Sequence, residues 1–332
     1  MLRRAEIQAA SAVCAAIAGA GFASGREIEA FFARLGTASW LGAAAACAGV
    51  GMLVFMLTTL ARKTGAASFP ELYGRLMDRR CRDVMHLLHG LLALMTASAM
   101  VAAGGELGAL ALDMKGARFA GALAALLAGA GLAVSGVPAL GRAGLALAAG
   151  MAGVYTALAF APAAGAAFSG EGLVATVPMG LLYAAFNGAL AGGVIVAAGR
   201  REVRPAQTGV AVALLMLVML LPANAALLRC DERLRQTALP TVVMAARWGI
   251  GGYYIVVALM ALSVVTTLGA MLASLRDQLA GLGVGRSAAL ALCAGAAALL
   301  SVCGFELLVN VVYPLLGWVS VFALLSLAFY VV

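Results

Sequence analysis

Residues 17–32 read IAGAGFASGREIEAFF. Three glycines and a serine fall within its first nine residues, and three charged residues follow between positions 26 and 29. A simple membrane anchor has no use for this pattern, because glycine weakens a helix and charged groups are costly in lipid. The stretch therefore indicates a hydrophobic segment that is interrupted.

The composition of the whole chain is that of an integral membrane protein. Of its 332 residues, 64% are hydrophobic and 11% are charged, and the mean hydropathy is +1.04. Soluble domains carry about 25% charged residues, and about 20 apolar residues cross a bilayer core of about 30 Å. We therefore expect one all-α transmembrane domain, 1–332, with ten spans at 7–33, 38–61, 84–112, 118–136, 143–161, 174–199, 206–229, 250–275, 286–303 and 307–331.

Ten spans divide into two sets of five, approximately 7–161 and 174–331. An odd number of spans per set requires that the second set enter the membrane from the opposite side. The two longest connectors, 62–83 and 230–249, each join the second and third helix of a set and lie on opposite faces. Inverted repeats of this kind build many secondary transporters, with the substrate at mid-membrane where the first helix of each repeat is interrupted.

Positive charges favour a cytoplasmic location for both termini. Fourteen basic residues fall on one side, at Arg3, Arg4, Arg62, Lys63, Arg75, Arg79, Arg80, Arg82, Arg142, Arg200, Arg201, Arg204, Arg276 and Arg286, and seven fall on the other, at Arg34, Lys115, Arg118, Arg229, Arg233, Arg235 and Arg247. The net charge of +8 thus orients helices in a membrane and does not indicate nucleic-acid binding. Residues 1–25 resemble a secretory signal, but the apolar stretch of 7–24 is long enough to favour a retained first helix.

Two segments are expected to be interrupted. In the first, residues 19–25, the glycines free backbone N–H and C=O groups that can bind a solute or a cation. The alternative is that a complete helix ends at Gly25 and an interfacial helix follows. In the second, residues 178–193, Tyr183, Asn187 and Gly188 disturb an apolar run; the alternative for Asn187 is a hydrogen bond between helices.

Four motifs carry a resemblance to a known family. They are GAGFASGREIEAFF, LLYAAFNGALAGG, VVTTLGAML and VVYPLLGW. Along essentially the whole chain they resemble the YkvI-like bacterial membrane proteins of the amino acid-polyamine-organocation superfamily, which shares the LeuT fold. The resemblance implies discontinuous first and sixth helices and a transport role, and it implies no particular substrate.

Two coupling mechanisms are open from the sequence. Ser263, Thr266 and Thr267 are adjacent hydroxyls that can supply oxygen ligands to a hard cation. The resemblance implies that they bind Na⁺ together with the backbone of Ala15 and Ala18, although such hydroxyls in membrane helices usually bond their own preceding carbonyls. Glu106 is the candidate for proton coupling, because an ionisable group at membrane depth is functional by default; the alternative is that the wet outer end of its helix solvates it.

Other charged and polar residues receive structural interpretations. Arg26, Glu27 and Glu29 are expected at the membrane interface. His86 and His89 have helical spacing, but no cysteine or carboxylate is patterned with them, so no metal site is expected beyond the candidate Na⁺ ion. No catalytic set and no nucleotide-binding loop is apparent, and no enzyme activity is expected.

The sequence therefore predicts a secondary active transporter. The expected cargo is a small amino-acid-like solute, coupled to Na⁺ or H⁺ and moved by alternating access; oligomeric state is left open. A passive channel and a membrane sensor or assembly protein are the alternatives. The expected substrate-binding residues are Gly19, Ala20, Gly21, Phe22, Ala23, Ser24, Gly25, Thr96, Ser98, Tyr183, Phe186, Asn187 and Gly188.

Overall fold

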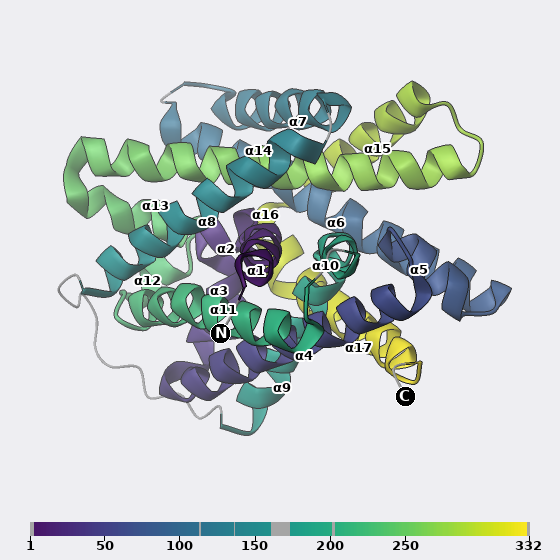
Figure 1. The fold of residues 1–332 in the computed structure, drawn as a ribbon. Helices are drawn as coiled ribbons and strands as arrows, with labels where there is room; N and C mark the ends of the chain where they lie inside the picture. The colour runs from purple at the N-terminus through teal and green to yellow at the C-terminus, as the bar shows by residue number, and fades with distance from the viewer. Residues whose placement is uncertain (1–2, 113, 136, 161–172, 201–202, 331–332) are drawn as a thin grey trace.

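The computed structural model describes residues 3–112, 114–135, 137–160, 173–200 and 203–330, with the side chains of 137–145 and 173 outside that description. All regular structure in these ranges is helical (Figure 1). The first part of the chain forms α1 (Arg4–Ile17), α2 (Ala20–Ser24), α3 (Arg26–Phe31), η1 (Ala33–Ala38), α4 (Ser39–Thr64), α5 (Phe69–Leu76), α6 (Arg79–Ala111), α7 (Ala117–Ser135) and α8 (Val137–Phe160). The second part forms α9 (Leu173–Leu190), α10 (Gly192–Gly199), α11 (Pro205–Leu228), α12 (Glu232–Arg235), α13 (Pro240–Ala245), η2 (Ala246–Trp248), α14 (Gly249–Gly281), α15 (Arg286–Ser301), α16 (Phe305–Leu307), η3 (Leu308–Val312) and α17 (Tyr313–Ala328).

Each of the ten expected apolar runs coincides with a helix or with a set of consecutive helices. In the described part of the chain, six helical segments are long and apolar enough to cross a membrane, or seven if α9 and α10 form one bent span. Two further apolar helices are shorter, at Ala146–Phe160 and Arg286–Ser301. The chain is therefore a multi-pass membrane protein by the length and composition of its helices.

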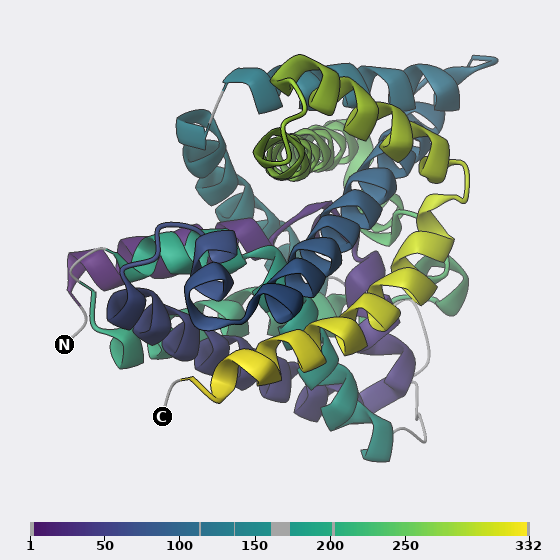
Figure 2. The same cartoon turned by 90° about the vertical axis from the view of Figure 1, so that its right-hand side faces the viewer.

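The helices form two packed groups (Figures 1 and 2). In one, α14 packs against α6, α7 and α15. In the other, α4 packs between α9 and α11, and α1 packs on α11. The short helix α2 contacts α14, and α8 contacts α1, α11 and α14, so these elements join the two groups.

Glycines allow several helix pairs to approach closely. Between α4 and α9, a methyl group on Gly180 would lie 2.2 Å from the carbonyl oxygen of Gly42. Between α6 and α7, a methyl group on Gly121 would lie 2.7 Å from the Cα of Gly108. Small residues at these crossings let the backbones meet, which is how membrane helices pack where lipid removes the hydrophobic driving force.

The first hydrophobic segment is broken twice. After α1, Gly19 is extended with φ −69° and ψ −177°, and its amide donates to the carbonyl of Ile17. After α2, Gly25 is left-handed with φ 80°, a conformation that favours glycine. The expectation of an interruption within residues 19–25 is confirmed, and residues 26–31 form a buried helix in place of an interfacial one.

The second interruption lies within the expected range 178–193, but beyond the three residues that were expected to cause it. Helix α9 runs without a break through Tyr183, Asn187 and Gly188, and the chain bends by 66° between α9 and α10, at Ala191. The amide side chain of Asn187 donates to the carbonyl of Tyr183 at 3.2 Å, which supports the helix locally. The expectation that these three residues interrupt the span is therefore wrong.

Both long connectors contain short helices. The first carries α5, and the second carries α12, α13 and η2. Figure 2 shows the start of α1 and the end of α17 on the same side of the molecule.

Candidate functional site

The break between α1 and α2 lies in the protein interior. Ala18, Ala20 and Phe22 are fully buried. In a continuous helix the amide of Gly19 would bond the carbonyl of Ala15, but here it turns to Ile17 at 2.7 Å. The backbone at this break therefore presents polar groups in a part of the fold where water is excluded.

Hydroxyl groups on α14 face this break. The Ser263 hydroxyl lies 3.5 Å from the carbonyl oxygen of Ala18, at the limit of a hydrogen bond. A methyl group on Gly19 would lie 3.1 Å from Thr267 Oγ1, so this second hydroxyl also borders the break. Thr266 donates to the carbonyls of its own helix, Leu262 at 2.8 Å and Ser263 at 3.1 Å. The structure thus brings Ala18, Ser263 and Thr267 together, while Thr266 shows the local bonding that was the alternative.

Glu27 is the polar centre of a second cluster. Its side chain is 4% exposed, and Oε2 has no hydrogen-bond partner within the described ranges. Its carboxyl group folds back over α2, since a methyl group on Gly21 would come 1.9 Å from Oε1 and 2.5 Å from Cδ. This carboxyl group was expected at the membrane interface, but it is buried in the core of the protein.

Three tyrosines on different helices lie within electrostatic range of this carboxyl group. They are Tyr155 on α8, Tyr183 on α9 and Tyr313 on α17. In the described structure the Tyr183 hydroxyl has no hydrogen-bond partner. The hydroxyls of Thr96 on α6 and Tyr313 approach each other and have no other partner there. A buried hydroxyl left without a partner costs about 1–3 kcal/mol, so the cluster is suited to a polar ligand.

Aromatic rings line the same region. Phe31 contacts Tyr183 edge-on with ring centroids 5.4 Å apart, and Phe186 lies 4.5 Å from Tyr313. Phe31 also stacks on Phe186 at 6.4 Å. Of the expected substrate-binding residues, the structure brings Gly21, Thr96, Tyr183 and Phe186 to this cluster.

Tyr155 joins the broken helix to the second long connector. It is fully buried, and its hydroxyl group contacts the carbonyl oxygen of Phe22 at 2.5 Å and Thr241 Oγ1 at 2.8 Å. Its ring packs edge-on against Phe22 at 5.5 Å. Tyr155 was not among the residues expected at the site. The one feature of the sequence that pointed to it is the presence of a tyrosine inside the apolar run of 143–161.

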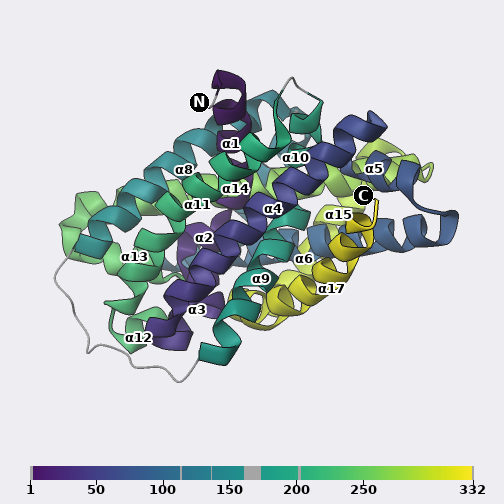
Figure 3. The same cartoon turned by 60° about the horizontal axis from the view of Figure 1, so that its bottom comes forward.

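Charged residues of α3 also bind this connector. Figure 3 shows the ribbons of α3, α12 and α13 in the same part of the molecule. Arg26 donates to the backbone carbonyls of Arg235 and Thr237, both at 3.2 Å. The Glu29 carboxylate lies 3.7 Å from Nε of Arg235. Arg26, Glu27 and Glu29 are 6%, 4% and 8% exposed, so other parts of the protein cover them, and their expected depth at the membrane interface stays a prediction. The connector folds back over α3 and provides partners for Arg26 and Glu29.

Glu106 lies away from this cluster. At the corner of α6 and α7 its carboxylate pairs with Arg118 at 3.0 Å, and the arginine side chain is 70% exposed. Ser98 donates to the carbonyl of Leu94 at 2.8 Å, within its own helix. Gly188 packs on α4, where a methyl group would lie 2.6 Å from Leu53. The proton-coupling role of Glu106 and the substrate-binding roles of Ser98 and Gly188 stay predictions.

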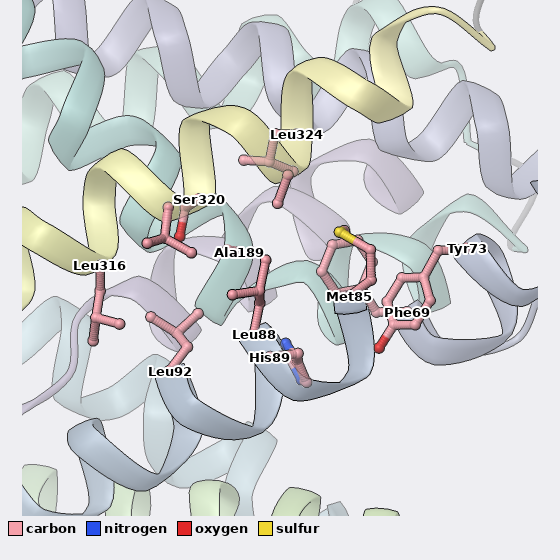
Figure 4. A pocket seen from close by; sticks show the side chains of 12 residues that line it. Phe69, Tyr73, Met85, Leu88, His89, Leu92, Ala189, Leu316, Ser320 and Leu324 are labelled. Atoms are coloured by element: carbon pink, nitrogen blue, oxygen red, sulfur yellow. The ribbon is translucent and has the colours of Figure 1, made fainter. Parts of the chain in front are cut away.

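A separate small pocket lies between α5, α6, α9 and α17 (Figure 4). His89 contacts the ring of Phe69 edge-on at 5.6 Å, and its Nε2 lies 3.5 Å from the Ser274 hydroxyl. No group of three metal-binding side chains occurs within the described residues. The pocket is lined by Phe69, Tyr73, Met85, Leu88, His89, Leu92, Ala189, Leu316, Val319, Ser320, Ala323 and Leu324.

Comparison with known proteins gives a match in fold. No protein-family model and no curated protein matches the chain, so membership of the YkvI-like family stays a prediction. Among solved structures, the chain resembles Mhp1, a nucleobase-cation-symport-1 family transporter in a closed conformation with bromovinylhydantoin bound. The TM-score is 0.63 at 15% sequence identity, covering 94% of this chain and 74% of Mhp1. The chain is therefore an all-helical membrane protein with the LeuT-like fold of Mhp1.

Proposed function

We propose that the chain is a secondary active transporter that moves a small amino-acid-like solute by alternating access, coupled to Na⁺ or H⁺. The observation that carries this proposal is the buried break at Ala18–Gly19, which faces hydroxyls of α14 and adjoins an unsatisfied polar cluster. A break inside a membrane domain is tolerated where it borders protein or a cavity, and such breaks form the binding sites of many transporters. The similarity in fold to Mhp1, a nucleobase-cation-symport-1 family transporter, supports this function.

The architecture proposed for this function is a single domain, 1–332, of ten spans in two inverted units of five. The first unit comprises the broken segment α1–α3, then α4, α6, α7 and α8. The second comprises the bent pair α9 and α10, then α11, α14, α15 and α17. Two features support the repeat: the leading segment of each unit is discontinuous, and the connector after each second span holds short helices. The bias of basic residues supports cytoplasmic termini in a bacterial inner membrane.

The proposed Na⁺ site lies where α14 meets the break. Its ligands are the hydroxyls of Ser263, Thr266 and Thr267 and the carbonyls of Ala15 and Ala18. The 3.5 Å approach of Ser263 to Ala18 and the position of Thr267 beside Gly19 support this set. Thr266 must turn its hydroxyl from its own helix to join the ion, which oxygen-rich coordination would favour.

The proposed substrate site extends from residues 19–25 to the aromatic cluster. Backbone groups of the break, Thr96 and the face of α9 that bears Tyr183 and Phe186 contribute to it. These groups come from three helical segments, α2, α6 and α9, which can move relative to one another during alternating access. In transporters with inverted repeats, two packed groups of helices move relative to each other around a fixed binding site.

Uptake into proteoliposomes tests this function. Protein reconstituted in liposomes is supplied with radiolabelled amino acids and related metabolites, with an inward Na⁺ gradient, an inward or an outward H⁺ gradient, or no gradient. We expect saturable uptake of at least one solute that depends on one of the gradients. Large unsaturable currents would instead identify a channel. Absence of transport for every solute, with sound folding, would leave the sensor or assembly role.

A further inference from the structure

Glu27 carries an acidic group that the fold leaves without a neutralising partner. Its side chain is 4% exposed on α3, and Oε2 accepts no hydrogen bond from the described residues. The other oxygen, Oε1, lies over Gly21. A buried unpaired carboxylate is among the costliest groups in a protein interior. The group must therefore carry a proton or pair with a cation that the chain does not supply.

The nearby charges on or beside α3 are engaged elsewhere. Arg26 donates to the backbone of the 230–249 connector. Glu29 faces Arg235 at 3.7 Å and also lies within Coulombic range of Arg34 on η1. The sequences of α2, α11 and η3, which also pack near α3, contain no charged residue. The ionisable groups on other helices that lie within electrostatic range of the carboxyl group are the phenols of Tyr155, Tyr183 and Tyr313.

These surroundings match the chemistry of an organic ammonium ion. The Tyr183 hydroxyl has no partner in the described structure, the hydroxyls of Thr96 and Tyr313 have none there besides each other, and each oxygen can accept a hydrogen bond from an N–H group. The rings of Phe31 and Phe186 border the same region, and aromatic rings attract cations. A bare proton would satisfy one carboxyl oxygen and leave the Tyr183 hydroxyl unpaired. The N–H donors of an amine cation can satisfy both the carboxylate and this hydroxyl.

Resting on the proposed transport function, we infer that Glu27 binds the ammonium group of the solute and holds a proton until the solute arrives. In the exchange, the neutral carboxylic acid releases its proton to solution and the carboxylate pairs with the R–NH₃⁺ group. Atoms and charge balance, because one positive charge leaves the site as another enters. The solute class is a primary amine, including the amino-acid-like solutes proposed above. Movement of the solute is thereby linked to movement of a proton in the opposite direction.

Proton release on amine binding tests this inference. Purified full-length protein at pH 7 in weak buffer with an indicator dye is titrated with phenethylammonium chloride, and with sodium phenylacetate as the anionic match. The wild type should release about one proton per bound amine and none with phenylacetate. Glu27→Gln keeps the shape without the charge, so it should fold, release no proton and bind the amine roughly ten- to a hundredfold more weakly. Glu71→Gln, which alters the carboxylate paired with Arg75 on the first long connector, should behave as the wild type.

Infrared spectroscopy provides a readout that does not require transport. The carbonyl stretching band of a protonated carboxylic acid should be present in the wild type at pH 7, disappear on addition of the amine, and be missing in Glu27→Gln. Absence of amine binding, binding without proton release, or an unchanged band in Glu27→Gln would each overturn the inference. Transport of a solute together with any of these results leaves the proposed function intact and removes only this site. Proton-linked amine binding without transport of any solute would instead contradict the proposed function.

Discussion

The substitution Tyr155→Phe tests how strongly the Tyr155 hydroxyl stabilises the broken helix. Tyr155→Phe keeps the ring, and with it the 5.5 Å edge contact to Phe22, and removes the group that bonds the Phe22 carbonyl at 2.5 Å and Thr241 at 2.8 Å. The Phe22 carbonyl still accepts from Gly25 at 3.0 Å, so the main loss falls on the buried Thr241 hydroxyl. Leaving such a group unpaired costs about 1–3 kcal/mol.

A matched substitution separates this effect from the general loss of a tyrosine hydroxyl. Tyr253 donates to the carbonyl of Leu110 at 2.8 Å in an exposed position, where water can replace the bond. Tyr253→Phe should therefore change the free energy of unfolding by no more than about 0.5 kcal/mol. Both variants are unfolded with denaturant in mixed micelles, and their free energies of unfolding are compared with that of the wild type. Equal and small losses for the two variants would refute the role assigned to Tyr155 in joining α2 to α13.

Two further substitutions test the sites beside the break. Gly21→Ala should destabilise the fold by about 1–3 kcal/mol in the same unfolding assay, because its methyl group would lie 1.9 Å from the Glu27 carboxyl group. Gly193→Ala is the control, since a methyl group there has no neighbour within 4 Å, and it should be neutral or stabilising by about 0.4–1 kcal/mol. Thr266→Ala combined with Thr267→Ala should abolish any rise in melting temperature that NaCl causes relative to KCl, because it removes two of the proposed ion ligands; an undiminished sodium effect in the double variant would show that the cation site lies elsewhere.

The sequence predicted the helical segments and the first break for simple physical reasons. Apolar runs near 20 residues long define helices in a membrane, and all ten runs coincide with helical segments. The glycines of 19–25 mark the first break because they permit the extended Gly19 and the left-handed Gly25. The family resemblance implied that Ser263 and Thr267 lie beside this break, and the structure places both hydroxyls there.

Contacts between distant segments could not be read from the sequence. Arg26 and Glu29 looked interfacial because nothing nearby in the sequence shows that the 230–249 connector folds over them. The bond between Tyr155 and Thr241 joins residues 86 positions apart. Asn187 looked like a helix breaker, but its side chain bonds within α9 and the bend occurs later. Local patterns thus identify helices and breaks, while the partners of buried polar groups depend on tertiary packing.

Hydrogen exchange of the backbone amides at residues 18–22 tests the central claim most directly. We propose that the first hydrophobic segment is broken inside the protein and that ligands bind at the peptide groups left without helical partners. In lipid nanodiscs these amides, above all those of residues 20–22, should exchange faster than those in the middle of α4, at residues 46–57. The amides of residues 20–22 are the first of α2 and lack helical partners. Addition of a transported solute with its coupling ion should slow exchange at 18–22 and leave α4 unchanged. Protection at 18–22 equal to that of α4, and indifferent to ligands, would contradict the account.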